Sequence, residues 1–215
     1  MRLKRADVLA GALRVLDAEG LAGLTMRRLA TDLNVAPGAL YWHFADKRAL
    51  LDAMAEHVIA GIEDVDPDEP WDRRVVEVSH RVRAALRSHR DGARLHAGTF
   101  VLQPHTLRVG NAYLRAFLDA GLPRDQAATT LFSVLHYVLG HTIEEQAREE
   151  LMAAGAWTTD ISGVPGTDAP EFADLAAALA GMDALDADTR FDDGLRTIVA
   201  GVRLRVAEAD APPRD

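Results

Sequence analysis

The chain has 215 residues, of which 48% are hydrophobic and 27% are charged, and its net charge at pH 7 is -9. This length is enough to bury a proper core, and the lack of any run of about 18 apolar residues excludes a membrane-spanning helix. Because the sequence contains no cysteine, it excludes disulfide bonds and thiolate metal sites, and any metal must be held by histidine and carboxylate groups.

The basic start, Met1–Arg5, leads into an amphipathic pattern and not into the apolar core of a signal peptide. We therefore expect a cytoplasmic protein without a membrane partner. The net charge argues at first against DNA as a partner, because DNA affinity depends on neutralising phosphates. However, residues 1–62 carry 8 Lys and Arg against 7 Asp and Glu, whereas residues 63–215 carry 16 against 26. The near-neutral first part can still bind DNA through arginines on one face.

The first predicted element is a helix over residues 5–19, where apolar side chains recur at helical spacing. Gly20 then provides a natural C-terminal stop. The stretch that follows, Thr25–Phe44, contains two short helices joined by a tight turn. This is the layout of a helix-turn-helix that reads DNA.

Local signals define the two short helices. Thr25 is the N-cap candidate of the first helix, Asn34–Ala36 forms the turn, and Pro37 suits the first position of the second helix. Leu40 and Phe44 can both face inward. That arrangement leaves five residues near the exposed side: Gly38, Ala39, Tyr41, Trp42 and His43. Exposure of the aromatic side chains to solvent is costly unless a partner covers them.

A longer helix is predicted to begin after the N-cap candidate Asp46 and to run to about Ile62. Asp64–Pro70 contains two prolines and four acidic residues, and therefore predicts a break. We accordingly expect a helix-turn-helix domain of three or four helices at residues 1–62 and a second helical domain at residues 71–210.

The second part again shows helical periodicity, which predicts helices at residues 72–90, 92–98, 105–119, 124–150, 171–181 and 189–209. Residues 155–170 are rich in glycine, proline and threonine and are expected to form a mobile loop. The long helix at 124–150 has a wide apolar face that we expect to be deeply buried: Leu131, Val134, Leu135, Val138, Leu139 and Ile143. Since no strand signal or repeat is found, the fold is predicted to be all-α.

The segment Leu40–Phe44, followed by Asp46–Leu51, resembles the TetR family of bacterial repressors, and in particular its tetracycline repressor branch. The likeness continues in Arg90–Thr99 and in Leu135–Gly140 with Glu144–Gln146. It covers residues 3 to about 150 well and the remainder in outline. The resemblance implies a homodimer, not an enzyme, that binds a palindromic operator and whose C-terminal domain senses a small effector that releases the DNA.

The resemblance also implies roles for residues of the first domain. In the family, the arginine matching Arg27 reads a guanine, and an arginine fork suits the guanine O6 and N7 atoms. A lysine at the start of the following helix, here Lys47, suits a phosphate. Because Pro37–Ala39 stand where the branch carries polar base-reading side chains, we expect a different operator sequence. The predicted DNA-binding residues are Arg27, Pro37, Ala39, Tyr41, Trp42, His43 and Lys47.

For the effector, the branch binds a magnesium chelate of its drug through a histidine that matches His96. A threonine matching Thr99 and, from the other subunit, a glutamate matching Glu144 act through waters. Spacing favours such sharing, because Glu144 lies eight residues after His136, roughly 12 Å along a helix. Near the end of a long helix, Glu144 and Glu145 would ordinarily face solvent.

Other positions depart from the branch. Glu63, Val78, Val82 and Tyr113 replace a histidine, an asparagine, a phenylalanine and a glutamine, and Phe100 replaces an arginine. An apolar or differently shaped effector is therefore as good a candidate as tetracycline. No cofactor is required, and Mg²⁺ bound together with the effector is left open. The predicted effector-binding residues are His96, Thr99, Phe100, Tyr113, Leu135, His136, Glu144, Val78 and Val82, with His96 as the metal ligand.

Two other functions remain open. A lone histidine such as His96 is more often a hydrogen-bonded structural residue than a ligand. One alternative is a metal-assisted hydrolase using His96, His136 and Glu144, although the sequence offers no close pair such as H-x-x-x-H. The other is a drug-binding protein that has lost DNA binding, for which the scarcity of base-reading groups in Pro37–Ala39 is the only support.

Overall fold

The computed structural model describes residues 3–99, 102–167 and 169–209, and over these residues it contains ten α-helices and no strand. The all-α prediction is confirmed. None of the described helices is both long and apolar enough to cross a membrane. The helices are α1 (Arg5–Gly23), α2 (Met26–Asp32), α3 (Pro37–Tyr41), α4 (Lys47–Val58), α5 (Trp71–Arg87), α6 (Gly92–Ala97), α7 (Pro104–Asp119), α8 (Arg124–Ala153), α9 (Ala173–Asp183) and α10 (Ala187–Ala209).

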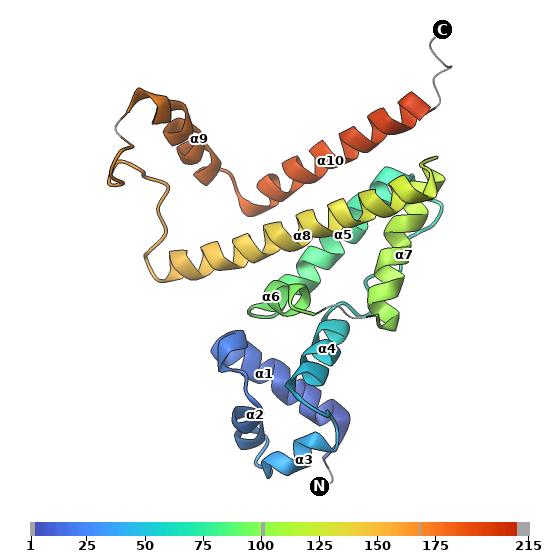
Figure 1. Ribbon diagram of the computed structural model, residues 1–215, viewed down its shortest axis with the longest axis vertical. Helices are drawn as coiled ribbons and strands as arrows, with labels where there is room; N and C mark the ends of the chain where they lie inside the picture. Colours follow the sequence, from blue (N-terminus) through green and yellow to red (C-terminus); the bar gives the residue numbers. More distant parts are fainter. Residues whose placement is uncertain (1–2, 100–101, 168, 210–215) are drawn as a thin grey trace.

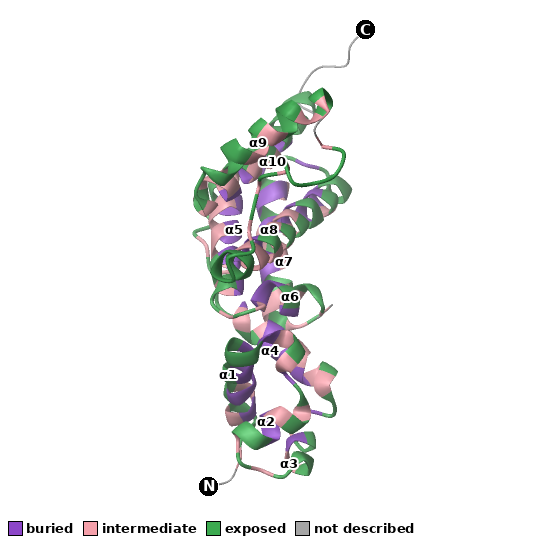
Figure 2. Ribbon diagram, turned by 90° about the vertical axis from the view of Figure 1, so that its left-hand side faces the viewer, coloured by how far each residue is buried: buried purple, intermediate pink, exposed green. Residues whose placement is uncertain are grey.

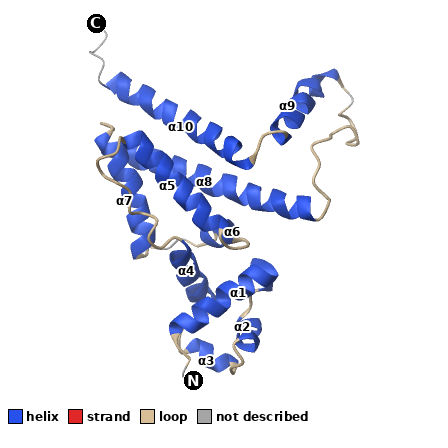
Figure 3. Cartoon of the chain, turned by 180° about the vertical axis from the view of Figure 1, so that it is seen from behind, coloured by secondary structure: helices blue, strands red, loops and turns tan. Residues whose placement is uncertain are grey.

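Helices α1 to α4 form one end of the molecule, with α3 at the tip (Figure 1). Helices α5, α7 and α8 pack against one another, and α10 runs along α8 at the opposite end (Figures 1 and 3). The small helix α6 lies between the two groups and contacts α4, α5 and α8. Helix α9 has no buried residue and stands beside this body, after a short 3-10 turn at Pro170–Phe172.

The local signals of the helix-turn-helix act as the sequence predicts. Thr25 Oγ1 accepts a hydrogen bond from the Arg28 N–H at 3.0 Å, and Asp46 Oδ1 accepts one from the Ala49 N–H at 2.7 Å. Each side chain satisfies one of the free N–H groups at the start of its helix. Asn34 adopts a positive φ of 52° in the turn, a conformation that Asn tolerates better than most residues.

In the first part of the chain, the ends of α1 and α4 differ from their predicted positions. Gly20 has a φ of 72° and breaks the regular helix as expected, but helical turns continue beyond it to Gly23. A Cβ atom at Gly20 would lie 2.9 Å from Asp91 Oδ2, which accepts a hydrogen bond from the Leu21 N–H. Helix α4 ends at Val58 and not near Ile62, because the chain leaves the helical conformation there and then takes a positive φ at Gly61.

The described residues form two apolar clusters, which appear as buried stretches along the helices in Figure 2. The first cluster is built from α1 to α4, with Leu40 and Met54 fully buried, and it includes Leu95 from α6. The second is built mainly from α5, α7, α8 and α10, and it includes Ile59 from the end of α4. The contact between α4 and α6 therefore connects the two apolar clusters.

The apolar face of α8 is less deeply buried than predicted. Leu131, Val134 and Val138 are buried, whereas Leu135, Leu139 and Ile143 are only half-buried. The prediction of deep burial for the latter three was wrong, because the neighbouring helices cover only part of the circumference of α8. A further large apolar side chain of this helix, Phe132, is 50% exposed.

A buried ion pair links α5 to α8. Arg83 Nε and Nη2 donate to the two oxygens of Glu145 at 2.9 and 2.6 Å, and the side chains are only 5% and 3% exposed. Arg83 also donates to Asp188 at the start of α10, and its guanidinium lies 4.7 Å from the centre of the Phe191 ring. The hydrogen bonds that Arg83 donates to Glu145 hold the pKa of Arg83 above its usual value. Its position near the end of a long helix had suggested that Glu145 faces solvent. The structure shows instead that the side chain is buried.

This pair gives a stability prediction. Glu145→Ala leaves the Arg83 guanidinium buried beside only the exposed Asp188, and we expect the free energy of unfolding to fall by about 3 kcal/mol. Glu149→Ala, which removes the exposed partner of Arg87, is the matched control and should cost less than about 1 kcal/mol. Urea denaturation at one fixed protein concentration measures both. Equal losses in the two variants would contradict the assignment.

Candidate functional site

The tip of the molecule carries a set of exposed aromatic and basic side chains on α2 and α3. Tyr41 is 51% exposed and Trp42 is 90% exposed. Of the two neighbouring arginines on α2, Arg28 is paired with Glu19, whereas Arg27 is exposed. In the sequence, only the family resemblance singled out Arg27, because helical spacing alone does not separate the two arginines. The structure leaves Arg27 as the more accessible one.

Helix α3 is only five residues long, and buried side chains anchor it. Leu40 and Phe44 are 0% and 2% exposed, and the Arg5 guanidinium lies 4.4 Å from the centre of the Phe44 ring. Because these anchors face inward, the remaining side chains of α3 point outward or to its edges. The other predicted DNA-binding residues lie on the same tip, with Pro37 exposed and Ala39, His43 and Lys47 half-buried.

Helix α4 connects the tip to the second half of the chain through two polar contacts. Glu56 accepts hydrogen bonds from the backbone N–H groups of His105 and Thr106, at 2.6 and 3.1 Å, and from the Thr106 hydroxyl at 2.9 Å. Arg48 Nη1 donates to the carbonyl oxygen of Gly98 at 3.1 Å. Side chains of α4 thus hold the end of α6 and the start of α7. Neither contact has a local signal in the sequence, because the partners lie about fifty residues apart.

His96 lies in the last turn of α6, beside α4. Burial lowers the pKa of its imidazole, while the Ala55 backbone and the Glu56 carboxylate act in the opposite direction. Within the described part of the chain, the buried Nδ1 atom has no hydrogen-bond partner. Thr99 Oγ1 donates to the His96 carbonyl oxygen at 2.9 Å. Phe100, another predicted effector-binding residue, falls outside the described residues.

Three further predicted effector-binding residues lie inside the second apolar cluster. Val78 and Val82 on α5 are 1% and 3% exposed, and Tyr113 on α7 is fully buried. The Tyr113 hydroxyl is 3.0 Å from Ser79 Oγ, and burial raises the pKa of this phenol well above its usual value. These side chains fill the space between α5 and α7 in this conformation.

The predicted effector-binding residues of α8 lie closer to the surface. His136 is exposed, with its ring centre 6.1 Å from that of Phe132, while Glu144 is exposed and Leu135 half-buried. Among the described residues, no group of three or more His, Asp or Glu side chains is placed to hold a metal ion. His96, His136 and Glu144 therefore do not form the preformed metal centre that the hydrolase alternative needs.

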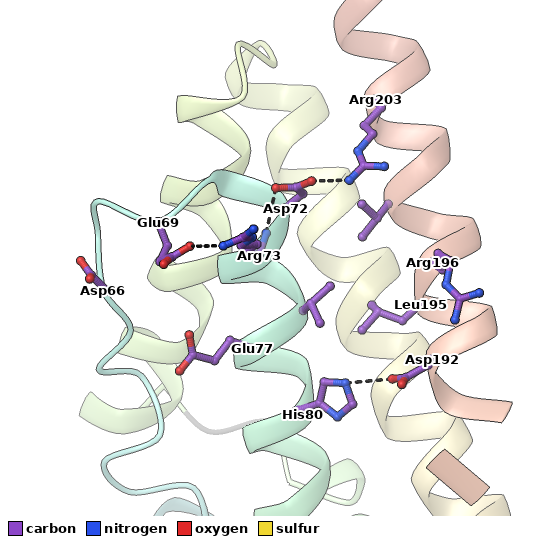
Figure 4. A pocket seen from close by; sticks show the side chains of 12 residues that line it. Asp66, Glu69, Asp72, Arg73, Glu77, His80, Asp192, Leu195, Arg196 and Arg203 are labelled. Carbon is purple, nitrogen blue, oxygen red and sulfur yellow. Dashed lines mark hydrogen bonds and ion pairs between the residues drawn. The ribbon is translucent and has the colours of Figure 1, made fainter. Parts of the chain in front are cut away.

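A large surface hollow of about 730 Å³ opens between α5, α10 and the segment before α5 (Figure 4). Its charged walls are largely paired with each other: Glu69 with Arg73 at 3.3 Å, His80 with Asp192 at 2.8 Å, and Asp72 with Arg203. None of the predicted site residues lines this hollow. It is therefore not where the sequence placed the effector.

Comparison with known proteins places both halves of the chain. Residues 8–54 match the bacterial regulatory proteins of the tetR family, and residues 65–206 match the tetracyclin repressor-like C-terminal domain. The tetracycline repressor protein class A from transposon 1721 of Escherichia coli is 35% identical over 217 residues, which cover 98% of this chain and 97% of that relative.

Solved structures agree. A possible TetR family transcriptional regulator from Streptomyces coelicolor A3(2) is 39% identical and superimposes with a TM-score of 0.83, over 94% of this chain and 99% of that one. BioQ, solved with its double-stranded DNA operator, is 32% identical with a TM-score of 0.69, over 94% and 98% of the two chains. The chain therefore belongs to the TetR family of bacterial regulatory proteins and is a ligand-responsive, DNA-binding transcriptional repressor, not an enzyme.

Proposed function

We propose that this repressor binds a palindromic operator as a homodimer through a domain at residues 1–62, and that a small effector bound within residues 71–210 releases the DNA. The observation that carries the proposal is the tip formed by α2 and α3. There, Arg27 and the aromatic pair Tyr41 and Trp42 are exposed on a frame anchored by buried residues. A chromosomal operator implies that the protein acts in the cytoplasm.

The side chains of the tip suit different parts of the DNA. Arg27 can donate two hydrogen bonds to the O6 and N7 atoms of guanine, which is the commonest base-specific contact of arginine. Lys47 and His43 suit the phosphate backbone, which fixes the position of the protein without reading sequence. Pro37 and Ala39 offer small apolar surfaces to thymine methyl groups. Few polar base-reading groups remain, so operator choice depends on Arg27, Tyr41 and the spacing of the two tips.

A dimer sets that spacing. Two recognition helices must enter major grooves about 34 Å apart, which is one turn of the DNA helix. Exposed apolar side chains on two helices of the second half of the chain, Phe132 on α8 and Leu204 on α10, are suited to contact with a second subunit. A change of a few ångströms in the separation of the two tips would then cost much of the operator affinity.

Effector binding can reach the tip through α4. His96 and Thr99 lie at the end of α6, and the following connection to α7 is held at both ends by Arg48 and Glu56 of α4. A ligand that changes this connection must displace α4 or break these hydrogen bonds. We propose that this is how the effector favours the arrangement that does not fit the operator.

The effector chemistry follows from its proposed surroundings. Val78, Val82 and Tyr113 provide an apolar interior with one phenolic group, and His96 provides an imidazole nitrogen that has no hydrogen-bond partner among the described residues. Leu135, His136 and Glu144 would contribute from α8 of the partner subunit, because in one chain they lie on its exposed or half-exposed side. Because Val78, Val82 and Tyr113 fill the space between α5 and α7 in the structure, the proposed effector is a planar, largely apolar molecule that inserts by moving these side chains apart. The tetracycline repressor relative makes tetracyclines one class to test.

A resident magnesium ion does not fit the residues of one chain. Mg²⁺ requires six ligands in octahedral geometry, mostly oxygens and waters, whereas His96 offers a single nitrogen and no group of three acidic or histidine side chains lies together in the described residues. His96 could therefore ligate Mg²⁺ only where the effector supplies most of the other ligands. We propose that the repressor requires no cofactor of its own.

DNA recognition is tested with the intergenic DNA next to the gene of the protein. We expect a specific band-shift complex, and Arg27→Ala should weaken it by about 1 to 3 kcal/mol and relax the preference at one base pair. Arg205→Ala, at an exposed position of α10, is the charge-matched control and should bind normally. A wild-type protein that forms no specific complex with this DNA would rule out the proposed role at its own gene.

Effector binding gives a pH prediction. In a thermal-shift screen of tetracyclines with and without Mg²⁺, polyketides and other planar compounds, we expect at least one ligand whose stabilisation is lost in His96→Ala. Because the pKa of His96 lies below its ordinary value of 6.5, the imidazole is neutral at neutral pH. Affinity should therefore stay constant as the pH falls to about 6.5 and decline only below it, as protonation competes with ligand binding.

Two results for such a ligand would contradict the proposed role of His96. If its affinity already declined between about pH 8 and 7, or if His96→Ala bound it as tightly as the wild type, His96 would not be the neutral group that contacts the effector.

A further inference from the structure

The end of α1 is attached to the turn between α5 and α6. Asp91 Oδ2 accepts a hydrogen bond from the Leu21 N–H at 2.8 Å. Asp17, four residues earlier in α1, accepts one from the Arg90 N–H at 3.1 Å and lies 3.0 Å from His89 Nδ1. These contacts join positions that are 70 to 73 residues apart in the chain. The DNA-reading end, helices α1 to α4, is therefore attached to the rest of the molecule at a second place, besides the contacts of α4.

Asp91 occupies the N-cap position of α6 but does not cap this helix. An aspartate at an N-cap ordinarily accepts a hydrogen bond from an N–H group in the first turn of its own helix. The Asp91 side chain makes no such bond. The Ala93 N–H donates instead to Oε1 of Gln146 on α8 at 3.2 Å, and Gln146 Nε2 donates to the His89 carbonyl oxygen at 2.9 Å. Because α8 supplies an acceptor for the start of α6, the Asp91 carboxylate is available to α1.

The backbone has a positive φ on both sides of this contact, 55° at Asp91 and 72° at Gly20. A positive φ is unfavourable for a residue with a Cβ atom, and it persists only where the surrounding structure imposes it, often at functional positions. A Cβ atom at Gly20 would lie only 2.9 Å from Asp91 Oδ2, so the glycine allows the carboxylate to approach α1. Local preferences therefore do not account for the conformation of Asp91, whereas the contact with α1 does.

We infer that Asp91 is a positioning residue for operator binding, which fixes the orientation of the DNA-reading end relative to α5 and α8. The inference rests on the operator binding proposed above. The start of α6 is fastened to α8 by Gln146 and to α1 by Asp91, whereas its end is held to α4 by Arg48. Without the Asp91 contact, the orientation of each tip is less well defined. A smaller fraction of dimers then has the tip spacing that the operator requires, which lowers the apparent affinity.

Two substitutions separate the hydrogen bond from charge and from backbone strain. Asp91→Gly and Asp91→Asn each remove one negative charge, and glycine and asparagine both tolerate a positive φ. Only asparagine keeps a side-chain oxygen that can accept a hydrogen bond from the Leu21 N–H. Loss of a negative charge by itself favours DNA binding, so a weaker complex cannot result from the change in charge.

Operator affinity and amide hydrogen exchange test the inference in the full-length protein. In quantitative band shifts without effector, Asp91→Gly should weaken operator binding about tenfold, because each subunit loses a hydrogen bond to a charged group. Asp91→Asn should bind like the wild type. In hydrogen exchange without DNA, the amides of residues 20–24 should exchange faster in Asp91→Gly than in the wild type, and Asp91→Asn should restore the slower rate. Exchange at residues 26–44 should not change, since their apolar cluster does not include Asp91.

Three results would overturn the inference: an Asp91→Gly variant that binds the operator as tightly as the wild type, an Asp91→Asn variant that binds as weakly as Asp91→Gly, or unchanged exchange at residues 20–24. Circular dichroism verifies that each variant is folded. A wild-type protein that forms no operator complex would defeat the proposed function instead. The exchange measurement requires no DNA, so it decides separately whether Asp91 holds α1.

Discussion

The structure depends on the contact between Glu56 of α4 and the first turn of α7. A helix begins with N–H groups that have no partner within the helix, and the partial positive charge there favours a carboxylate. Glu56 supplies this carboxylate from a helix that belongs mainly to the DNA-reading end, so the cap of α7 and the position of α4 are fixed by the same hydrogen bonds. Arg48 makes the equivalent connection to the end of α6. Neither end of the α6–α7 connection can move independently of α4.

The body behind this contact is stiffened by a different kind of interaction. The buried pair of Arg83 and Glu145 fastens α5 to α8, and Asp188 and Phe191 bring the start of α10 to the same guanidinium. A buried pair of this kind adds little net stability but makes alternative packings costly, since each would leave a charge unpaired. With the body held in this way, a ligand is expected to act where the contacts are exposed and replaceable, at the α4 junction.

The sequence was sufficient for features that depend on neighbouring residues. Thr25, Pro37 and Asp46 mark helix starts by their own chemistry, and the spacing of Leu40 and Phe44 shows which face of α3 is buried. It was insufficient where residues far apart in the chain meet. Glu56 contacts Thr106 fifty positions away, and Arg83 contacts Glu145 sixty-two positions away, so no local pattern reveals either pair. For α8, helical periodicity could identify the apolar residues but not how much of the helix its neighbours cover.

In the proposed mechanism α4 sets the position of the two tips, and distance measurements between the tips test this role most directly. The chain has no cysteine, so Ala45→Cys places a single spin label on the exposed tip of each subunit. Pulsed electron–electron double resonance on the dimer then gives the distribution of distances between the two labels. In the Glu56→Gln variant, we predict a markedly broader distribution than with Glu56 intact, and operator DNA should narrow it again. Equal widths with and without the substitution, in the absence of DNA, would contradict the role assigned to this contact.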